Sequence, residues 1–559
     1  MNSRMDGQYF PASGANIERM SQPTKTARFQ PMATVAFATI LAACGSDSPP
    51  AVDYISQLTN LNPEFTVTQE EAYTWARAKD DNSPGLTGSP EWHGWLQDLE
   101  QRFASYGVVD MVHNGWEFER WETSDEPTDW SLHIDGNAVN VAFYGAYSGK
   151  TGPDGITADL VYYDHNNPPE SIEGKIVVIP TRPPPEKPFP PQYRNSYTYM
   201  DYEYRTDGKT YPELFEYVDP ADSYTFEIYY QLGQGLHRIA IDGNSAGLVI
   251  VYDMGYERTS GLYSFPVPAR YDVPTLTLDR IEGAKVIAYA QAGKTATLRL
   301  EARTETAEAY QLIGYLPGKD YGTEQDEQIL MITHTDGPSI TQDNGALGIL
   351  AAVRYFSNIP QQERPRTLAL YLDARHYITG MERAFSDVTW FERYPEMKDP
   401  VVAIMHMEHL GELEYKELGE KIVPTGLAEH AVLWTRNNPI LIDAAIDAVK
   451  TYQPRRVTVS VPERPGVNGD VQERWWGVAS FGQGEMYRGD GWDVPMFGFG
   501  GWLGNYWTTH SGIENWDKDL FVRQANTMTQ LTGVLMTVDL EKAQSRGVSD
   551  SRDPVFMTE

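Results

Sequence analysis

The stretch from Tyr310 towards the end of the chain alternates between short apolar runs and longer runs with helical periodicity. The strand-like runs are 328–333, 368–372, 401–405 and 494–499, and the helical ones include 346–356, 441–452 and 522–538. Runs that alternate in this way build a sheet with helices packed against it. The sequence therefore predicts an α/β domain in this part of the chain.

Ionisable side chains follow three of the strand-like runs. His334 and Asp336 follow the first, Asp373 the second and Glu408 the third, while Asp343 precedes a helical run. Open α/β sheets place their sites at the ends of their strands. Each residue alone has an ordinary explanation, since Asp343 would serve as a helix cap and His334 as a core histidine. Together they predict a metal site, because zinc accepts mixed imidazole and carboxylate ligands.

The stretch from about Asn137 to Arg303 has a different texture, with β-rich runs separated by Gly and Pro turns. The runs are 158–163, 175–179, 246–252 and 295–300, and they predict a separate β-rich module. A proline run at 183–191 and a tyrosine-rich stretch at 193–230 predict a surface excursion, with a lid or subunit contact as the alternative. Before the module, an amphipathic helix is predicted between Ser89 and Gly107.

The formal net charge of −33 disfavours nucleic acid and anionic lipid headgroups as partners. Cys44 is the only cysteine, which excludes an intrachain disulfide. It directly follows an apolar run at 32–43, and Lys25 and Arg28 precede that run. Basic residues followed by an apolar run are typical of a secretory signal. Leu-Ala-Ala-Cys at 41–44 resembles a bacterial lipobox. We therefore expect an exported lipoprotein, periplasmic or at the cell surface, held to the membrane only through lipidated Cys44. The alternative is a buried N-terminal helix with a chance cysteine.

The order of the candidate ligands is similar to that of a known enzyme group. His-x-Asp at 334–336, Asp-Asn-Gly-Ala at 343–346, a carboxylate before Leu-Gly at 408–411 and a Thr-His turn at 509–510 resemble the co-catalytic zinc exopeptidases. This superfamily includes bacterial leucyl aminopeptidases, glutamate carboxypeptidase and the transferrin receptor. The segments 85–90 and 311–320 are similar to the family's lead-in segments, and 174–179 and 273–278 look like parts of its inserted protease-associated domain.

The resemblance implies an α/β fold with a mixed-sheet zinc-exopeptidase domain of the phosphorylase/hydrolase-like kind and an inserted β-rich protease-associated domain. We divide the chain accordingly into a signal peptide with an N-terminal extension (1–43), a tether and the first part of the peptidase domain (44–136), the protease-associated domain with its Pro/Tyr-rich insertion (137–303), the main peptidase domain (304–545) and a C-terminal tail (546–559).

The resemblance also implies roles for individual residues. His334 and Glu408 would bind one metal ion, His510 would bind a second, and Asp343 would bridge the two. Asp336 would orient His334. After the strand equivalent to 368–372 the family has two adjacent glutamates, a general base and a ligand of the second metal. This chain reads Asp-Ala-Arg-His at 373–376, so both glutamates are missing.

The missing glutamates change the expected chemistry. One site keeps three protein ligands, whereas the second keeps only Asp343 and His510 unless His376 substitutes. Arg375 disfavours a second dication and favours an anionic group of a substrate. We therefore expect a single zinc ion. Asp373, His376, His409 or Glu485 would replace the base, and proximity in sequence favours His376 and Asp373.

These residues predict an aminopeptidase-like, metal-dependent hydrolase of peptide or amide bonds, with metal-bound water as the nucleophile. Two alternatives stay open: an amidase acting on a small N-acylated metabolite, and a non-catalytic binding homologue that lacks the general-base glutamate. An aromatic and glycine-rich run at 475–507 leads into His510. It is either core or the lining of an apolar substrate pocket.

Overall fold

The computed structural model describes residues 53–124, 127–181, 197–200, 236–263, 270–377, 395–436, 438–461, 494–501 and 508–544. Within these ranges, no helix combines the length and the apolar character needed to cross a membrane. Several predictions fall outside them, namely those on the signal peptide and Cys44, on the proline run, on Glu485 and on the C-terminal tail.

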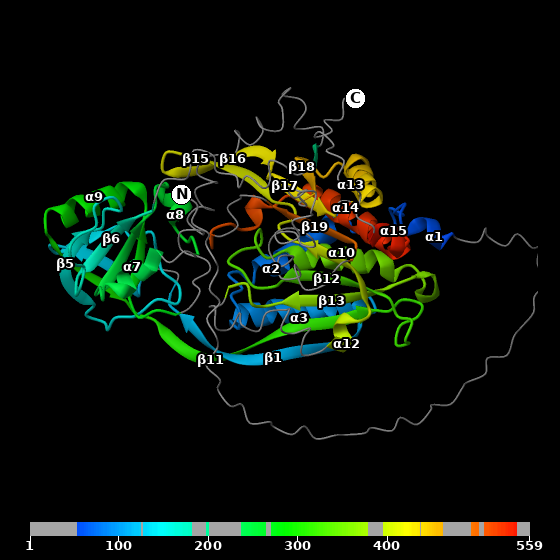
Figure 1. Cartoon of the computed structure of the whole chain (residues 1–559), viewed down its shortest axis with the longest axis horizontal. Helices are drawn as coiled ribbons and strands as arrows, with labels where there is room; N and C mark the ends of the chain where they lie inside the picture. Colours follow the sequence, from blue (N-terminus) through cyan, green and yellow to red (C-terminus); the bar gives the residue numbers. More distant parts are fainter. Residues whose placement is uncertain are drawn as a thin grey trace, which may run out of the picture. The chain divides into compact units, whose positions relative to one another are not determined.

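The main sheet has nine strands, and helices pack along it (Figure 1). In spatial order the strands are β1 (Val109–Glu122), β11 (Arg303–Leu316), β13 (Thr367–Asp373), β12 (Gln328–His334), β14 (Val401–Met407), β19 (Met496–Gly501), β17 (Ala431–Thr435), β18 (Val457–Val461) and β7 (Tyr197–Met200). The four runs predicted as strands after Tyr310 are thus confirmed. The edge strand β7 was not predicted, and it comes from the tyrosine-rich stretch interpreted as a surface excursion.

The central strands of the main sheet run in the same direction. Strand β12 pairs in parallel with β13 and with β14, and β14 pairs in parallel with β19. His334 lies beside Asp373 in the register, and Ile332 lies beside His406. Strands β11 and β17 join this group antiparallel, so the sheet is mixed. The carboxyl ends of β13, β12 and β14 therefore meet at one edge, as the sequence predicts.

Alternate residues of the central strands serve two different cores. Ile329 and Met331 belong to the large cluster that includes the helices, whereas Leu330 and Ile332 belong to a smaller cluster on the opposite face. Because side chains alternate along a strand, His334 continues the second series. Asp373 and His406 continue the equivalent series of β13 and β14, after Tyr371 and Ile404. The polar groups thus gather at the end of the face opposite the large helical core.

Five helices of the main domain begin at a side-chain cap, namely α1 (Tyr54–Gln57), α2 (Gln69–Asp80), α3 (Pro90–Ser105), α13 (Pro439–Tyr452) and α14 (Lys518–Thr537). Other helices of this domain are α10 (Gly345–Ser357), η3 (Gln361–Glu363), α12 (Pro395–Lys398), η6 (Ile513–Asn515) and α15 (Leu540–Gln544). Helix α3 is the amphipathic helix predicted from the sequence. Ser89 caps it by accepting a hydrogen bond from the amide of Trp92, with proline at the first helical position.

A second sheet of eight strands contains the four runs predicted for the β-rich module, together with a strand at Trp130–Ile134 that lies before the predicted start at Asn137. Its spatial order is β3 (Asn137–Val139), β2 (Trp130–Ile134), β10 (Thr295–Leu300), β5 (Ile156–Tyr162), β6 (Ile176–Pro180), β8 (Gly247–Val251), β9 (Thr275–Leu278) and β4 (Phe143–Tyr144). Helices α7 (Leu236–Asp242), α8 (Tyr256–Thr259) and α9 (Arg280–Gln291) occur in the same stretch, and β15 (Leu413–Leu418) with β16 (Lys421–Ala428) forms a separate hairpin. That this module is a protease-associated domain stays a prediction.

The packing around His430 predicts how stability depends on pH. Its Nε2 lies 3.0 Å from Oγ1 of Thr458, and burial lowers the pKa of His430 to about 3, with Arg456 adding to the effect. An unfolded histidine has a pKa of about 6.5, so below that pH the unfolded chain binds the extra proton and stability falls. The free energy of unfolding is measured by urea denaturation at pH 7 and at pH 5. From pH 7 to pH 5 this free energy should fall by about 2 kcal/mol less in His430→Gln than in the wild type. Equal losses would contradict a lowered pKa for the partly buried His430.

Candidate metal centre

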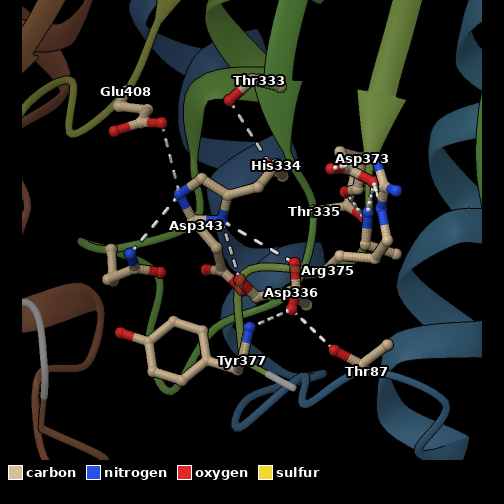
Figure 2. A network of polar contacts seen from close by, with 12 residues as sticks. Thr87, Thr333, His334, Thr335, Asp336, Asp343, Asp373, Arg375, Tyr377 and Glu408 are labelled. Carbon is tan, nitrogen blue, oxygen red and sulfur yellow. Dashed lines mark hydrogen bonds and ion pairs between the residues drawn. The ribbon is translucent and has the colours of Figure 1, made fainter. Parts of the chain in front are cut away.

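His334 ends β12 and is fully buried. Its Nδ1 lies 2.8 Å from the backbone carbonyl oxygen of Asp336. A carbonyl oxygen only accepts, so Nδ1 carries the proton and donates it. The lone pair of the neutral imidazole is then on Nε2, which lies 3.8 Å from Oε1 of Glu408. Figure 2 shows Glu408 on this side of the ring, and Asp336 with Thr87 and Tyr377 on the other.

Glu408 and His409 form the turn that follows β14. Both side chains are buried, and together with His334 they offer ligand atoms that all lie within 4.8 Å of one another. Adjacent residues of a strand point to opposite faces. His409, however, has a φ of 54°, a left-handed conformation that is uncommon for a residue other than glycine. This turn brings Glu408 and His409 to the same place.

The protonation states in this cluster suit a cation. Burial raises the pKa of the Glu408 carboxyl, but His406, with Nε2 2.9 Å from Oε1, and His334 oppose this and hold it below its ordinary value. Burial lowers the pKa of His409 to about 4. At neutral pH the centre therefore offers a carboxylate at Glu408 and a neutral imidazole at His409. Both are the forms that bind metal ions.

The Asp-Asn-Gly motif at 343–345 is explained by its contacts with the turn after β14. Asn344 accepts a hydrogen bond of 2.8 Å from the amide of Leu410 and donates one of 2.7 Å to the carbonyl of the same residue. At Gly345, a Cβ atom would lie 2.0 Å from the carbonyl oxygen of Met407, so no larger residue fits. This clamp fixes the Asp343 turn against the Glu408 turn.

Asp343 itself is fully buried, and its two oxygens have different surroundings. Oδ2 lies 2.9 Å from Nζ of Lys79, whereas Oδ1 has no hydrogen-bond partner among the described residues. Burial raises the pKa of Asp343 to about 6, against the opposing effect of Lys79. An unpartnered buried carboxylate oxygen is costly unless a cation or a donor meets it. Oδ1 is thus of the donor type that zinc accepts, but Asp343 lies outside the cluster of His334, Glu408 and His409 whose ligand atoms lie within 4.8 Å of one another.

Asp336 orients His334 differently from the role that the resemblance implies. Its backbone carbonyl, not its carboxylate, bonds to Nδ1; the nearest carboxylate oxygen is 4.0 Å away. The carboxylate oxygen Oδ2 accepts hydrogen bonds from Oγ1 of Thr87 at 2.6 Å and from the amide of Tyr377 at 2.7 Å. Asp336 therefore joins the segment before α3 and the end of the 373–377 segment to the loop that follows β12.

Asp373 and Arg375 neutralise each other. The guanidinium of Arg375 donates from Nε to Oδ1 of Asp373 at 2.9 Å and from Nη2 to Oδ2 at 3.0 Å, and both residues are buried (Figure 2). Gln311 donates a further hydrogen bond of 3.0 Å to Oδ1. Both carboxylate oxygens of Asp373 are therefore occupied by donors of the fold. The guanidinium of Arg375, which was predicted to attract an anionic group of a substrate, is already paired with Asp373.

His376 and His510 lie in different surroundings. The ring of His376 stacks on that of His334, with centroids 4.1 Å apart, so it lies beside the candidate ligands. His510 is exposed, and its Nε2 lies 3.2 Å from Oγ of Ser260. His510 is not part of the cluster formed by His334, Glu408 and His409 among the described residues. Of the aromatic run at 475–507, Phe497 and Phe499 are described, and both are core residues.

Comparison with solved structures identifies the fold. No protein-family model and no curated protein matches the sequence. A solved structure of a peptidase M28 precursor from Shewanella amazonensis SB2B is similar with a TM-score of 0.57 and 14% identity, covering 87% of this chain and 97% of that one. A zinc aminopeptidase from Bacillus subtilis is similar with a TM-score of 0.52 and 11% identity, covering 87% and 99%. The chain therefore has the fold of the zinc exopeptidases, as the resemblance implies.

The clamp between the two turns predicts that Asn344→Ala damages both the fold and the centre. Removing the amide leaves the buried N–H of Leu410 without its partner, whereas the carbonyl of Leu410 still accepts a hydrogen bond of 2.9 Å from Nε1 of Trp516, so the cost is roughly 2 kcal/mol. Zinc affinity is expected to fall at least tenfold, because Asp343 and Glu408 lose their mutual position. Denaturation and calorimetric titration with zinc measure the two effects. Asn358→Ala, which removes an exposed hydrogen bond of 2.8 Å at the other end of α10, is the control and should cost under about 1 kcal/mol.

Proposed function

We propose that this protein is an aminopeptidase-like hydrolase that cleaves peptide or amide bonds with the help of one zinc ion. The observation that supports the proposal best is the buried cluster of His334, Glu408 and His409, whose ligand atoms lie within 4.8 Å of one another at the carboxyl edge of the main sheet. The unpartnered Oδ1 of the buried Asp343, which lies outside this cluster, is a further candidate donor. The fold shared with the zinc aminopeptidase from Bacillus subtilis supports a peptide substrate.

Each residue of the centre has a definite task under this proposal. A zinc ion, when bound, acts as a Lewis acid and makes water more acidic. Nε2 of His334, Glu408, His409 and Oδ1 of Asp343 would hold it. The carbonyl of Asp336 keeps the proton of His334 on Nδ1, so the lone pair is on Nε2, which lies 3.4 Å from the side-chain amide nitrogen of Gln342. His376 takes the place of the missing base, since its ring stacks on His334 while Asp373 is occupied by Arg375.

The same proposal extends to where the enzyme works. The lipobox-like segment ending at Cys44 supports export and attachment through a lipid on that cysteine. An aminopeptidase-like enzyme at that location would meet peptides outside the cytoplasm.

His334→Ala tests the metal site. We expect the variant to lose bound zinc and at least a hundredfold in activity on aminoacyl and N-acyl amides, because it removes a ligand. Zinc content by mass spectrometry and hydrolysis rates measure the outcome. His113→Ala is the matched control, since His113 is half exposed and pairs with Glu100 at 2.8 Å. Full activity in His334→Ala would refute the site. A wild type without metal or activity would instead favour the non-catalytic homologue.

His376→Gln tests the proton acceptor. Glutamine keeps the approximate size of the side chain but does not take up a proton near neutral pH. We expect kcat to fall by about 10²–10⁴ with little change in KM, and the acidic limb of the pH–rate profile to disappear. Zinc content should be that of the wild type. A parallel loss of zinc would show that His376 is a ligand, and an unchanged kcat would assign the base to another residue.

A further inference from the structure

Lys79 is a lysine buried beside the candidate metal centre. It lies in the last turn of α2, and its side chain is 0% exposed. Its Nζ lies 2.9 Å from Oδ2 of Asp343 and 3.2 Å from Oγ of Ser83, and it is 5.9 Å from the ring centroid of Trp95. Lysine is almost never fully buried unless its charge is paired. The pair with Asp343 is therefore what keeps this ammonium group inside the protein.

The segment after α2 holds the ammonium in place. A Cβ atom on Gly85 would lie 3.2 Å from Nζ of Lys79, so glycine leaves the space that the lysine uses. The carbonyl of Gly85 accepts a hydrogen bond of 3.0 Å from the amide of Gly337. Nε1 of Trp92 donates one of 3.1 Å to Oγ1 of Thr335. These bonds fasten the segment to the loop that carries His334, which fixes the distance between Lys79 and the centre.

The two oxygens of Asp343 thus face two different partners. Oδ2 meets the ammonium of Lys79, and Oδ1 is the oxygen that fits a metal ion. We infer that Lys79 occupies, in place and in charge, the position of a second metal ion, and so makes the centre mononuclear. The inference rests on the proposed function, because it concerns Asp343, a candidate ligand of the proposed zinc site, and its partner Lys79. A monovalent cation belonging to the chain would replace a divalent one taken from solution.

The other groups available to a second ion agree with this assignment. Where the related exopeptidases have their glutamate pair, this chain has Arg375 bound to Asp373. The remaining candidate ligand, His510, bonds to Ser260. A dication at Oδ2 would meet Lys79 at close range, where the repulsion between the two charges is strong even with partial screening. Charge and ligand supply therefore both oppose a second ion.

Metal stoichiometry tests the inference without any assay of activity. The full chain, Lys79→Met, Lys79→Glu and the control Lys542→Met are stripped with a chelator, loaded with zinc and dialysed, and zinc is counted per chain. Lys542 is 71% exposed and lies 3.2 Å from Asp539, away from the centre. We expect one ion in the wild type and in Lys542→Met. Lys79→Glu is expected to hold two, because it places a second carboxylate beside Asp343.

Thermal unfolding with and without zinc gives a second readout. In chelator, Lys79→Met should unfold at least about 5 °C below the wild type, because Asp343 loses its buried partner. Zinc should then stabilise this variant more than the wild type. If Lys79→Glu folds only in zinc, its ions are counted after refolding with zinc. If it does not fold with or without zinc, the inference is tested by the change in unfolding temperature of Lys79→Met.

The outcomes separate this inference from the proposed function. Two ions in the wild type would overturn the role of Lys79 and leave the hydrolase intact. The role of Lys79 would also be overturned if Lys79→Met had the same unfolding temperature and the same stabilisation by zinc as the wild type. No zinc in the wild type would reject the metal centre itself, and the inference with it.

Discussion

Buried charge at the carboxyl edge of the main sheet is the constraint on which the candidate centre depends. Three carboxylates there are each paired with a lysine, arginine or histidine side chain: Asp343 with Lys79, Asp373 with Arg375 and Glu408 with His406. An unpaired carboxylate in this position would cost several kcal/mol or take up a proton. The pairs offset part of the cost of burying these groups, and they also reduce the negative charge that would otherwise attract several cations.

The pairings separate structural carboxylates from those that can bind a ligand. Both oxygens of Asp373 are bound by Arg375, so its charge is used within the fold. Asp336 uses one carboxylate oxygen to join Thr87 and Tyr377, and its carbonyl to hold His334. At Asp343 a single oxygen is paired with Lys79. The position of a carboxylate at a strand end is therefore insufficient to identify it as a metal ligand. The hydrogen-bond and ion-pair partners of its oxygens show whether it can bind a metal ion.

The sequence predicted the fold well because the central strands are uniformly apolar and bounded by polar residues. The runs at 328–333, 368–372 and 401–405 become β12, β13 and β14 with ends within one or two residues. His334, Asp343 and Glu408 could be named because each follows or precedes such a run. His409 was considered only as a base. Strand alternation alone would direct its side chain away from Glu408. Its left-handed backbone reverses that direction, and residue type does not signal this for histidine. Lys79 could not be found, because its pairing with Asp343 joins segments far apart in the chain.

The clamp between Asn344 and Leu410 has a consequence for how a metal ion would be acquired. It is made of amide groups, none of which is a ligand, and it positions the Asp343 and Glu408 turns through the backbone. A site assembled in this way is preorganised: the ordering of its ligands is completed during folding and is independent of the ion. Folding and metal uptake are then separate events, in contrast to small zinc domains whose fold forms only around the metal.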